Sequence, residues 1–165
     1  KFTNLKWKSE MKKTILLSAA CLALVFVLSS TQAEEKAKKV TTVKCVVAGK
    51  EIKIADAKVA KYRDASVYVC CDKCKAALEK DSSKFATKAN HQLFLTSQAT
   101  QTKCPISGRD LDSTKTVEIS GVSVAFCCGN CQGKADKAKG DDQLAIAFED
   151  KAFDKGFKVN KKTEE

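Results

Sequence analysis

Eight of the nine cysteines in this 165-residue chain form two sets of four that share one spacing. Each set has a lone cysteine, a small residue and a glycine three and four positions later, and then Cys-Cys-x-x-Cys. The lone cysteine is separated from that pattern by 24 residues in one set and 22 in the other. Such matched spacing indicates an internal duplication. The sets are Cys45, Cys70, Cys71 and Cys74, and Cys104, Cys127, Cys128 and Cys131.

The residues between these cysteines predict a small α+β unit in each copy. Gly49 and Gly108 follow the small residues Ala48 and Ser107, and glycine readily adopts the positive φ that a tight turn requires. We call this turn the knuckle. Short β-prone runs further along each copy flank turn residues and predict a hairpin. The expected strands are 58–62 and 66–69 in the first copy, and 116–119 and 122–126 in the second.

A helix is expected directly after each Cys-Cys-x-x-Cys pattern. In the first copy it should cover Asp72–Lys80, with Asp72 as the N-cap. In the second copy Gly129 and Gly133 should weaken it, because glycine costs about 1 kcal/mol in a helix interior relative to alanine. Apolar side chains that can supply small cores are Leu78, Phe85, Leu144, Ile146, Phe148, Phe153 and Phe157.

Thiolates that converge from a knuckle and from the start of a helix suit a soft or borderline cation such as Zn²⁺ or Cu⁺. The partial positive charge of the helix N-terminus is expected to lower the pKa of Cys70, Cys71 and Cys74 and to stabilise an anionic site. A unit of about 50 residues also buries too little apolar surface to fold without a metal or disulfides. All eight repeated cysteines are therefore candidate metal ligands.

These residues resemble the YHS and TRASH-type domains, small treble-clef-like modules associated with heavy-metal binding, sensing and trafficking. The family pattern is a Cys-x-x-Cys-Gly knuckle, a spacer, an aromatic residue and Cys-x-x-x-Cys. The resemblance covers most of residues 44–150 and implies two tandem modules of zinc-finger type. The matching cysteines are Cys45, Cys70 and Cys74 in the first copy, and Cys104, Cys127 and Cys131 in the second, where Phe126 matches the aromatic residue.

The sequence departs from that family at the second knuckle cysteine, which is replaced by Ala48 and Ser107. Cys71 and Cys128 are additional cysteines beside each closing pair, and either can restore a fourth ligand. Adjacent cysteines, however, do not easily share one tetrahedral site in relaxed geometry. The expected coordination is then three thiolates plus an exogenous ligand, an arrangement suited to an exchangeable metal.

Two other readings of the cysteines remain open. In an oxidising compartment the four cysteines of a copy can pair as disulfides, for example Cys45 with Cys70 and Cys71 with Cys74. Alternatively, each Cys-x-x-Cys at a helix start can serve thiol–disulfide exchange. The strand–helix–strand pattern of thioredoxin surrounds neither motif. No pattern of catalytic residues is evident, so an enzyme is not expected.

The N-terminal region has the features of a secretory signal peptide. Met11 is followed by two lysines, an apolar run over 14–28 and small residues that predict cleavage after Ala33. A membrane anchor is the alternative, although roughly 15 apolar residues fall short of the ~20 that a spanning helix needs. Lipidation at Cys21 is disfavoured, because this cysteine lies inside the apolar run. The chain is therefore expected in the periplasm of a bacterium or outside the cell.

The expected organisation follows from the duplication and the charged ends of the chain. The lysines that give the net charge of +10 are scattered rather than clustered, so a nucleic-acid partner is not expected. The expected partners are the metal ion and a periplasmic or envelope protein. His91 is a linker residue or an extra ligand. The segments are 1–33, N-terminal extension and signal peptide; 34–43, flexible linker; 44–90, first module; 91–102, linker; 103–157, second module; 158–165, disordered tail.

Overall fold

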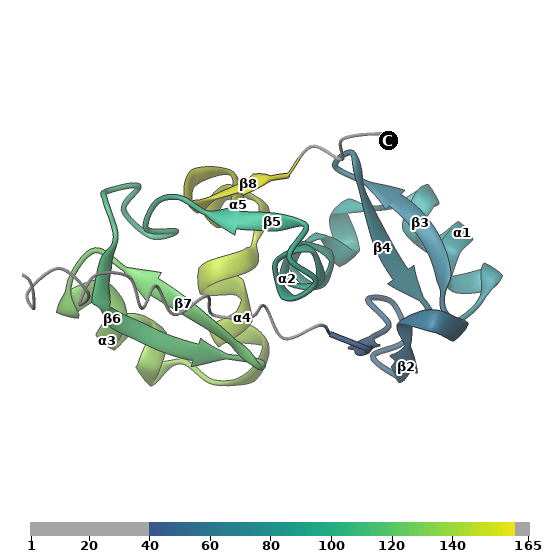
Figure 1. Cartoon of the computed structure of the whole chain (residues 1–165), viewed down its shortest axis with the longest axis horizontal. Coiled ribbons are helices and arrows are strands. Elements are labelled where there is room, and N and C mark those ends of the chain that lie inside the picture. The colour runs from purple at the N-terminus through teal and green to yellow at the C-terminus, as the bar shows by residue number, and fades with distance from the viewer. Residues whose placement is uncertain (1–39, 161–165) are drawn as a thin grey trace, which may run out of the picture. The chain divides into compact units, whose positions relative to one another are not determined.

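The computed structural model describes residues 40–160 and shows a small α+β fold (Figure 1). This range contains five α-helices and four two-stranded antiparallel sheets. None of the helices in it is long and apolar enough to cross a membrane. The expected signal peptide, most of the expected linker 34–43 and residues 161–165 lie outside the described residues.

The first copy runs from a short sheet through a hairpin to a helix. Strands β1 (Thr42–Lys44) and β2 (Glu51–Lys53) pair on either side of the first knuckle. Strands β3 (Lys58–Tyr62) and β4 (Ala65–Val69) form the hairpin, and α1 (Asp72–Lys80) follows directly. Short 3₁₀ turns precede β3 and follow α1.

The second copy repeats the hairpin and helix and then continues further. After the second knuckle, the chain forms a longer hairpin, a helix that matches α1, two more helices and a final strand. That final strand pairs antiparallel with β5 (Ala99–Gln101), which precedes the second knuckle. The elements are β6 (Asp112–Ile119), β7 (Val122–Phe126), α3 (Gly129–Lys137), α4 (Gly140–Phe148), α5 (Asp150–Gly156) and β8 (Phe157–Val159).

The local predictions are confirmed at the knuckles and hairpins. Gly49 and Gly108 have φ of 69° and 74°, as a tight turn requires. Both hairpins close through two residues of positive φ, a geometry that matches the twist of paired strands. Helix α1 has the predicted bounds, although its N-cap is Cys71 rather than Asp72. Helix α3 is as long as α1 despite its glycines, because Ala135 packs its inner face into the core.

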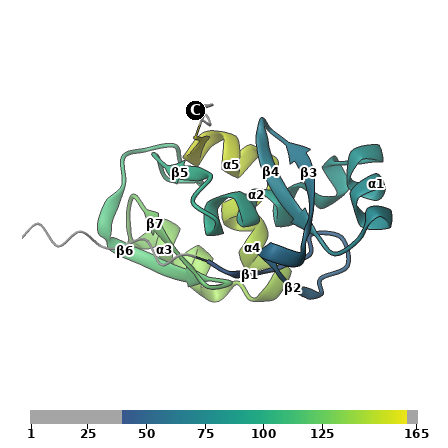
Figure 2. The ribbon, with the colours of Figure 1, turned by 45° about the vertical axis from the view of Figure 1, so that its right-hand side comes forward.

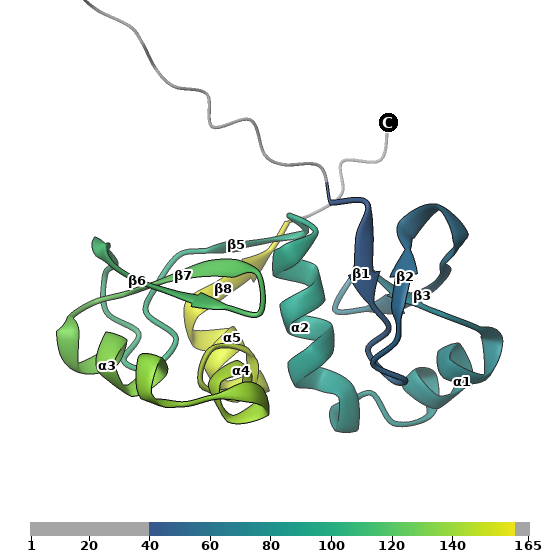
Figure 3. The same cartoon turned by 90° about the horizontal axis from the view of Figure 1, so that it is seen from below.

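Residues 91–102, expected to be a linker, instead contribute to the core. They form the second half of α2 (Ala86–Leu95), a turn and β5. Helix α2 packs against α4 and lies between elements of the two copies (Figure 3). Leu93 and Phe148 are fully buried in one cluster that includes residues of both copies. Where small cores were expected, the two copies therefore share one. Phe85 and Ile146 pack at its margin as half-buried side chains.

The turn of the β3–β4 hairpin is fixed against α5 (Figure 2). Arg63 forms ion pairs with Asp154 and, at 2.6 Å, with Asp150, and its guanidinium lies 5.3 Å from the centre of the Phe153 ring. Asn90 in α2 donates a hydrogen bond of 3.1 Å to the same Asp150 carboxylate. Left-handed backbone is unfavourable for a residue with a side chain. These contacts hold Arg63 in that conformation and tie the first copy to the second.

The C-terminal end of α5 packs directly on the second knuckle. The backbone N–H groups of Thr102 and Lys103 both donate hydrogen bonds to the Gly156 carbonyl, at 2.8 and 3.0 Å. A Cβ atom on Gly156 would lie 2.9 Å from the Cα of Pro105, closer than real Cβ atoms approach a backbone. The contact between α5 and the knuckle therefore depends on a glycine at position 156.

We expect Gly156→Ala to lower the free energy of unfolding by about 1–3 kcal/mol, because the new methyl group collides with backbone that cannot easily move. Gly133→Ala is the matched control. Gly133 lies inside α3 with no described atom near its missing Cβ, so alanine there should be neutral or stabilise by up to about 1 kcal/mol. Urea unfolding followed by circular dichroism measures both. A Gly156→Ala variant as stable as the parent chain would contradict the packing described.

Candidate metal centres

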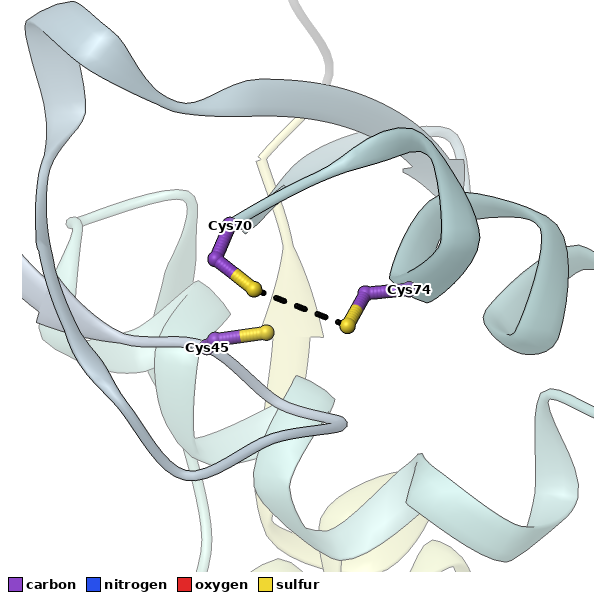
Figure 4. A group of neighbouring side chains, drawn as sticks. All are labelled: Cys45, Cys70 and Cys74. Carbon is purple, nitrogen blue, oxygen red and sulfur yellow. Dashed lines mark hydrogen bonds between the residues drawn. The ribbon is translucent and has the colours of Figure 1, made fainter.

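The first centre is a group of three cysteines from three elements (Figure 4). Cys45 follows β1 at the start of the knuckle, Cys70 follows β4, and Cys74 lies in the first turn of α1. Their sulfur atoms lie within 4.8 Å of one another, and the Sγ atoms of Cys70 and Cys74 are 3.6 Å apart. Cys45 is buried, and the other two side chains are half-buried. The group is thus shielded from solvent at Cys45 in the knuckle and partly exposed to solvent at Cys70 and Cys74.

The second centre repeats this arrangement. Cys104 opens the second knuckle, Cys127 follows β7, and Cys131 lies in the first turn of α3. These three sulfur atoms also lie within 4.8 Å of one another, with 3.8 Å between Cys127 and Cys131. Here both Cys104 and Cys131 are buried. The predicted duplication therefore brings together equivalent cysteines in both copies.

The sulfur spacing fits a thiolate-bound cation. Two sulfurs bound at about 2.3 Å with a tetrahedral angle between them lie about 3.8 Å apart. The separations of 3.6 Å between Cys70 and Cys74 and 3.8 Å between Cys127 and Cys131 match this value, and the other pairs lie within 4.8 Å. Each group supplies three ligand atoms, which leaves a fourth tetrahedral position free or suffices for trigonal coordination. Two groups of three cysteines can thus each hold a metal ion.

Cys71 and Cys128 lie beside these groups rather than in them. Each has an extended backbone at the N-cap position of its helix, and its Sγ lies 3.8 or 3.7 Å from that of the preceding cysteine. In the first centre the N–H group of Cys74 lowers the pKa of the Cys71 thiol; in the second, that of Cys131 does the same for Cys128. Both are half-buried, accessible neighbours of the ligand groups.

The remaining expectations concern disulfides and His91. All eight cysteines in the described residues are free thiols, so the pairs Cys45–Cys70 and Cys71–Cys74 are not formed. His91 belongs to neither metal-binding group. Its Nε2 lies 3.2 Å from the Ser120 carbonyl oxygen, its ring meets Phe148 edge-on, and burial lowers its pKa. The contacts of His91 are therefore those of a packing residue between the copies.

In the first centre, the thiols differ in pKa. Burial opposes ionisation of Cys45, but the backbone N–H groups of Ala48, Cys70 and Val47 outweigh it and lower the pKa of the Cys45 thiol. Burial and the neighbouring thiols of Cys70 and Cys71 raise the pKa of Cys74 to about 12, and the pKa of Cys70 is also raised, so the expected lowering at the helix start holds for Cys71 alone. Ionisation is therefore favoured at Cys45 and opposed at Cys74.

The second centre shows the same division more strongly. Burial opposes ionisation of Cys104, yet the Ser107 hydroxyl and the N–H groups of Ser107, Cys127 and Ile106 lower the Cys104 pKa to about 6. Burial, the Cys127 thiol and the charge of Cys104 raise the pKa of Cys131 to about 12. A bound cation offsets this repulsion and allows the remaining thiols to lose their protons.

Two glutamine side chains, which sequence reasoning missed, fix the distance between the knuckle and the closing cysteines. Gln92 in α2 accepts a hydrogen bond from the Tyr68 N–H at 2.6 Å and donates to the carbonyls of Tyr68 and Lys44 at 3.0 and 2.9 Å. Tyr68 stands two residues before Cys70, and Lys44 directly precedes Cys45. The Gln92 amide therefore bridges the two chain segments that carry these ligands.

Gln101 in β5 makes the equivalent bridge in the second copy. It accepts a hydrogen bond from the Ala125 N–H at 3.0 Å and donates to the carbonyls of Ala125 and Lys103 at 2.7 and 3.4 Å. Gln92 lies after its closing cysteines and Gln101 before its knuckle, so the two are not equivalent in the repeat. No sequence signal linked them, because the same contact is reached from different elements.

Comparison of the chain with family models, with curated proteins and with solved structures finds no match. Soft sulfur ligands that converge at metal-binding distances, with one coordination position left open, favour binding of a thiophilic cation.

Replacing Gln92 with Met should weaken the first centre and leave the second largely intact, whereas Gln101→Met should do the reverse. Each change leaves backbone polar groups without partners, at a cost of about 1–3 kcal/mol for the fully buried Gln92. Cd²⁺ titration followed by thiolate charge-transfer absorbance measures both centres. Gln143→Met, which removes one hydrogen bond to Ala135, is the control and should change neither. Equal loss at both centres in either glutamine variant would show that the bridges do not act locally.

Metal binding should release protons, and its apparent affinity should rise with pH. Cys104 is already ionised above about pH 6, whereas Cys131 keeps its proton through neutral pH and must lose it on binding. Between pH 6 and 8 we expect about a tenfold gain in affinity per pH unit for each proton released. Calorimetry in buffers of different ionisation enthalpy counts these protons. The Cys71→Ser/Cys128→Ser variant should release the same number, and affinity independent of pH would contradict thiolate ligation.

Proposed function

We propose that this chain is an exported metal-binding protein that holds Zn²⁺ or Cu⁺ through two three-thiolate sites and serves in metal handling rather than catalysis. The observation that carries the proposal is the convergence of three sulfur atoms within 4.8 Å, repeated in both copies. A single group of this kind can arise from core packing of cysteines. Its repetition from the same three elements supports selection for a ligand.

The ligand set supports a soft or borderline cation. Thiolate sulfur favours Zn²⁺ and Cu⁺, whereas Mg²⁺ and Ca²⁺ take oxygen ligands. Three thiolates satisfy a trigonal Cu⁺, and a Zn²⁺ ion needs one further ligand. An exogenous donor supplies that ligand in the simplest case, and Cys71 or Cys128 lies close enough to its neighbour to approach the same ion.

The partly exposed side of the first centre supports exchange of the metal. In the first centre Cys70 and Cys74 are half-buried, and Cys71 is accessible beside them. An incoming thiolate of a partner protein can reach the open coordination position from this side. We therefore assign the protein to metal trafficking or storage, with an envelope protein as the exchange partner.

The sequence pattern supports the cellular setting and the module type. The resemblance to YHS and TRASH-type domains favours treble-clef-like modules, and a knuckle facing a hairpin and a helix start suits that type. The features of residues 1–33 favour export through a signal peptide cleaved after Ala33, which places the chain in the periplasm or outside the cell. In that setting oxidation of the thiols competes with metal binding.

Elemental analysis of the chain, purified without chelator, tests this function. We expect two equivalents of Zn or Cu, one for each group, and eight reactive thiols in the described range after denaturation. Cys45→Ser should lose one equivalent, and Cys45→Ser/Cys104→Ser should lose both. Cys71→Ser/Cys128→Ser is the matched control and should retain two, since neither residue belongs to a three-sulfur group.

Two outcomes would replace the proposal with an alternative. A metal-free chain without reactive thiols would identify a disulfide-stabilised scaffold. A metal-free chain with disulfide reductase activity that Cys71→Ser abolishes would identify a redox protein.

A further inference from the structure

We propose that the two centres have different tasks: the second retains its metal, and the first exchanges it. This inference rests on the proposed function and concerns how that function is divided. It comes from differences in what surrounds two nearly identical groups of ligands. Three such differences are present, at the fourth knuckle position, around the knuckle glycine and at the helical cysteine.

The first difference is a hydroxyl group beside one centre and a methyl group beside the other. Ser107 Oγ lies 3.1 Å from the Sγ of Cys127 and accepts a hydrogen bond from the Arg109 N–H at 3.3 Å. A metal-bound thiolate has no proton to donate, so Ser107 must then donate its hydroxyl proton, either to Cys127 or to the neighbouring Cys104 that it also contacts. The corresponding residue in the first copy is Ala48, whose side chain has no proton to offer.

A hydrogen bond of this kind strengthens a metal site without adding a ligand. Donors to an ionised group form stronger hydrogen bonds than donors to a neutral one, so the contact is worth most when the thiolate is formed. Loss of such partners of metal ligands typically costs 10–100-fold in metal affinity. We expect a difference of this order between the centres, and we assign Ser107 as a positioning residue that acts through the ligands Cys127 and Cys104.

The second difference is the support beneath each knuckle. The side chain of Lys155 in α5 packs over Gly108, where a Cβ would lie 3.2 Å from its Cγ, and its Nζ donates a hydrogen bond of 2.9 Å to the Ile106 carbonyl. At Gly49, a Cβ would meet no other atom of the described residues within 4 Å. Helix α5 braces the second knuckle from outside, whereas the first knuckle is held by the pairing of β1 with β2 on either side of it.

The third difference is access to the helical ligand. Cys131 is 7% exposed, whereas the equivalent Cys74 is half-buried. An incoming ligand must reach the metal through the more open side of a centre, and within the described residues the first knuckle glycine has no contact like that of Lys155 with Gly108. Both differences favour faster exchange at the first centre. The hydroxyl, the brace and the burial thus all favour retention at the second centre.

The test uses the full chain loaded with ¹¹³Cd²⁺ as the probe. Two resonances are expected, one for each centre, and Cys45→Ser and Cys104→Ser assign them. During stepwise addition of EDTA, the resonance of the first centre should disappear first. The second centre should require about 10–100-fold more competitor, in line with its additional hydrogen bond.

Reciprocal variants show whether the hydroxyl is the cause. Ser107→Ala should shift the second resonance and reduce its retention about tenfold or more, and Ser107→Thr, which keeps a hydroxyl, should restore most of it. Ala48→Ser should increase retention at the first centre. Both side chains are exposed, so these changes leave the core unaltered. Lys155→Met tests the contact of Lys155 with the second knuckle separately from the Ser107 hydroxyl. It should speed metal exchange at the second centre without the change in ¹¹³Cd resonance that Ser107→Ala causes.

The possible results distinguish failure of this inference from failure of the proposed metal-binding function. Two bound ¹¹³Cd²⁺ ions that EDTA removes together would overturn the division of tasks and leave the metal-binding function standing. A second centre unchanged in Ser107→Ala would overturn the role of Ser107. A chain that binds no Cd²⁺ at all would overturn both the inference and the proposed function.

Discussion

Repulsion between neighbouring thiolates is the constraint on which the two cysteine centres of this fold depend. Three sulfur atoms lie within 4.8 Å of one another in each copy, so full ionisation requires a cation among them. Without one, the fold accommodates the charge by lowering the pKa of the knuckle thiol and raising that of the helical thiol. In the first copy, the backbone N–H groups of Ala48, Cys70 and Val47 stabilise the thiolate of the knuckle cysteine Cys45. The backbone around each centre therefore stabilises negative charge on the cysteines, and a bound cation would be needed to neutralise that charge once all three thiols are ionised.

The apolar interior explains why the two copies cannot be treated as separate modules. Each copy is too small to enclose a substantial core, and the structure solves this by sharing one. Helix α2 packs on α4, and Arg63 ties the first hairpin to α5. Gln92 then transmits the position of α2 directly to the segments that carry Cys45 and Cys70. Packing between the copies thus helps to set the geometry of the first centre.

The sequence predicted features that depend on local chemistry. Glycine at positive φ, the hairpins, the helix over Asp72–Lys80 and the convergence of three cysteines per copy all follow from short motifs. Features that depend on tertiary contacts were not predictable in this way. The segment 91–102 reads as polar and lacks a clear period, yet its buried residues Gln92 and Leu93 face β4 and the core. A buried glutamine is stable only when its amide is hydrogen-bonded, and the sequence does not show which backbone groups will be its partners.

Tandem duplication itself accounts for the inequality of the two centres. The chain that leaves the first copy must continue into the second knuckle, whereas the chain that leaves the second is free to fold back. It does so as α5 and β8, and the pairing of β8 with β5 holds Gly156 against the segment before Cys104. Helix α5 therefore braces the second knuckle, whereas within residues 40–160 the first knuckle is held by the pairing of β1 with β2 and contacts no equivalent helix. A linear repeat closed on itself in this manner gives two matching groups of cysteines different surroundings, and these surroundings are the basis of the proposed difference in metal retention.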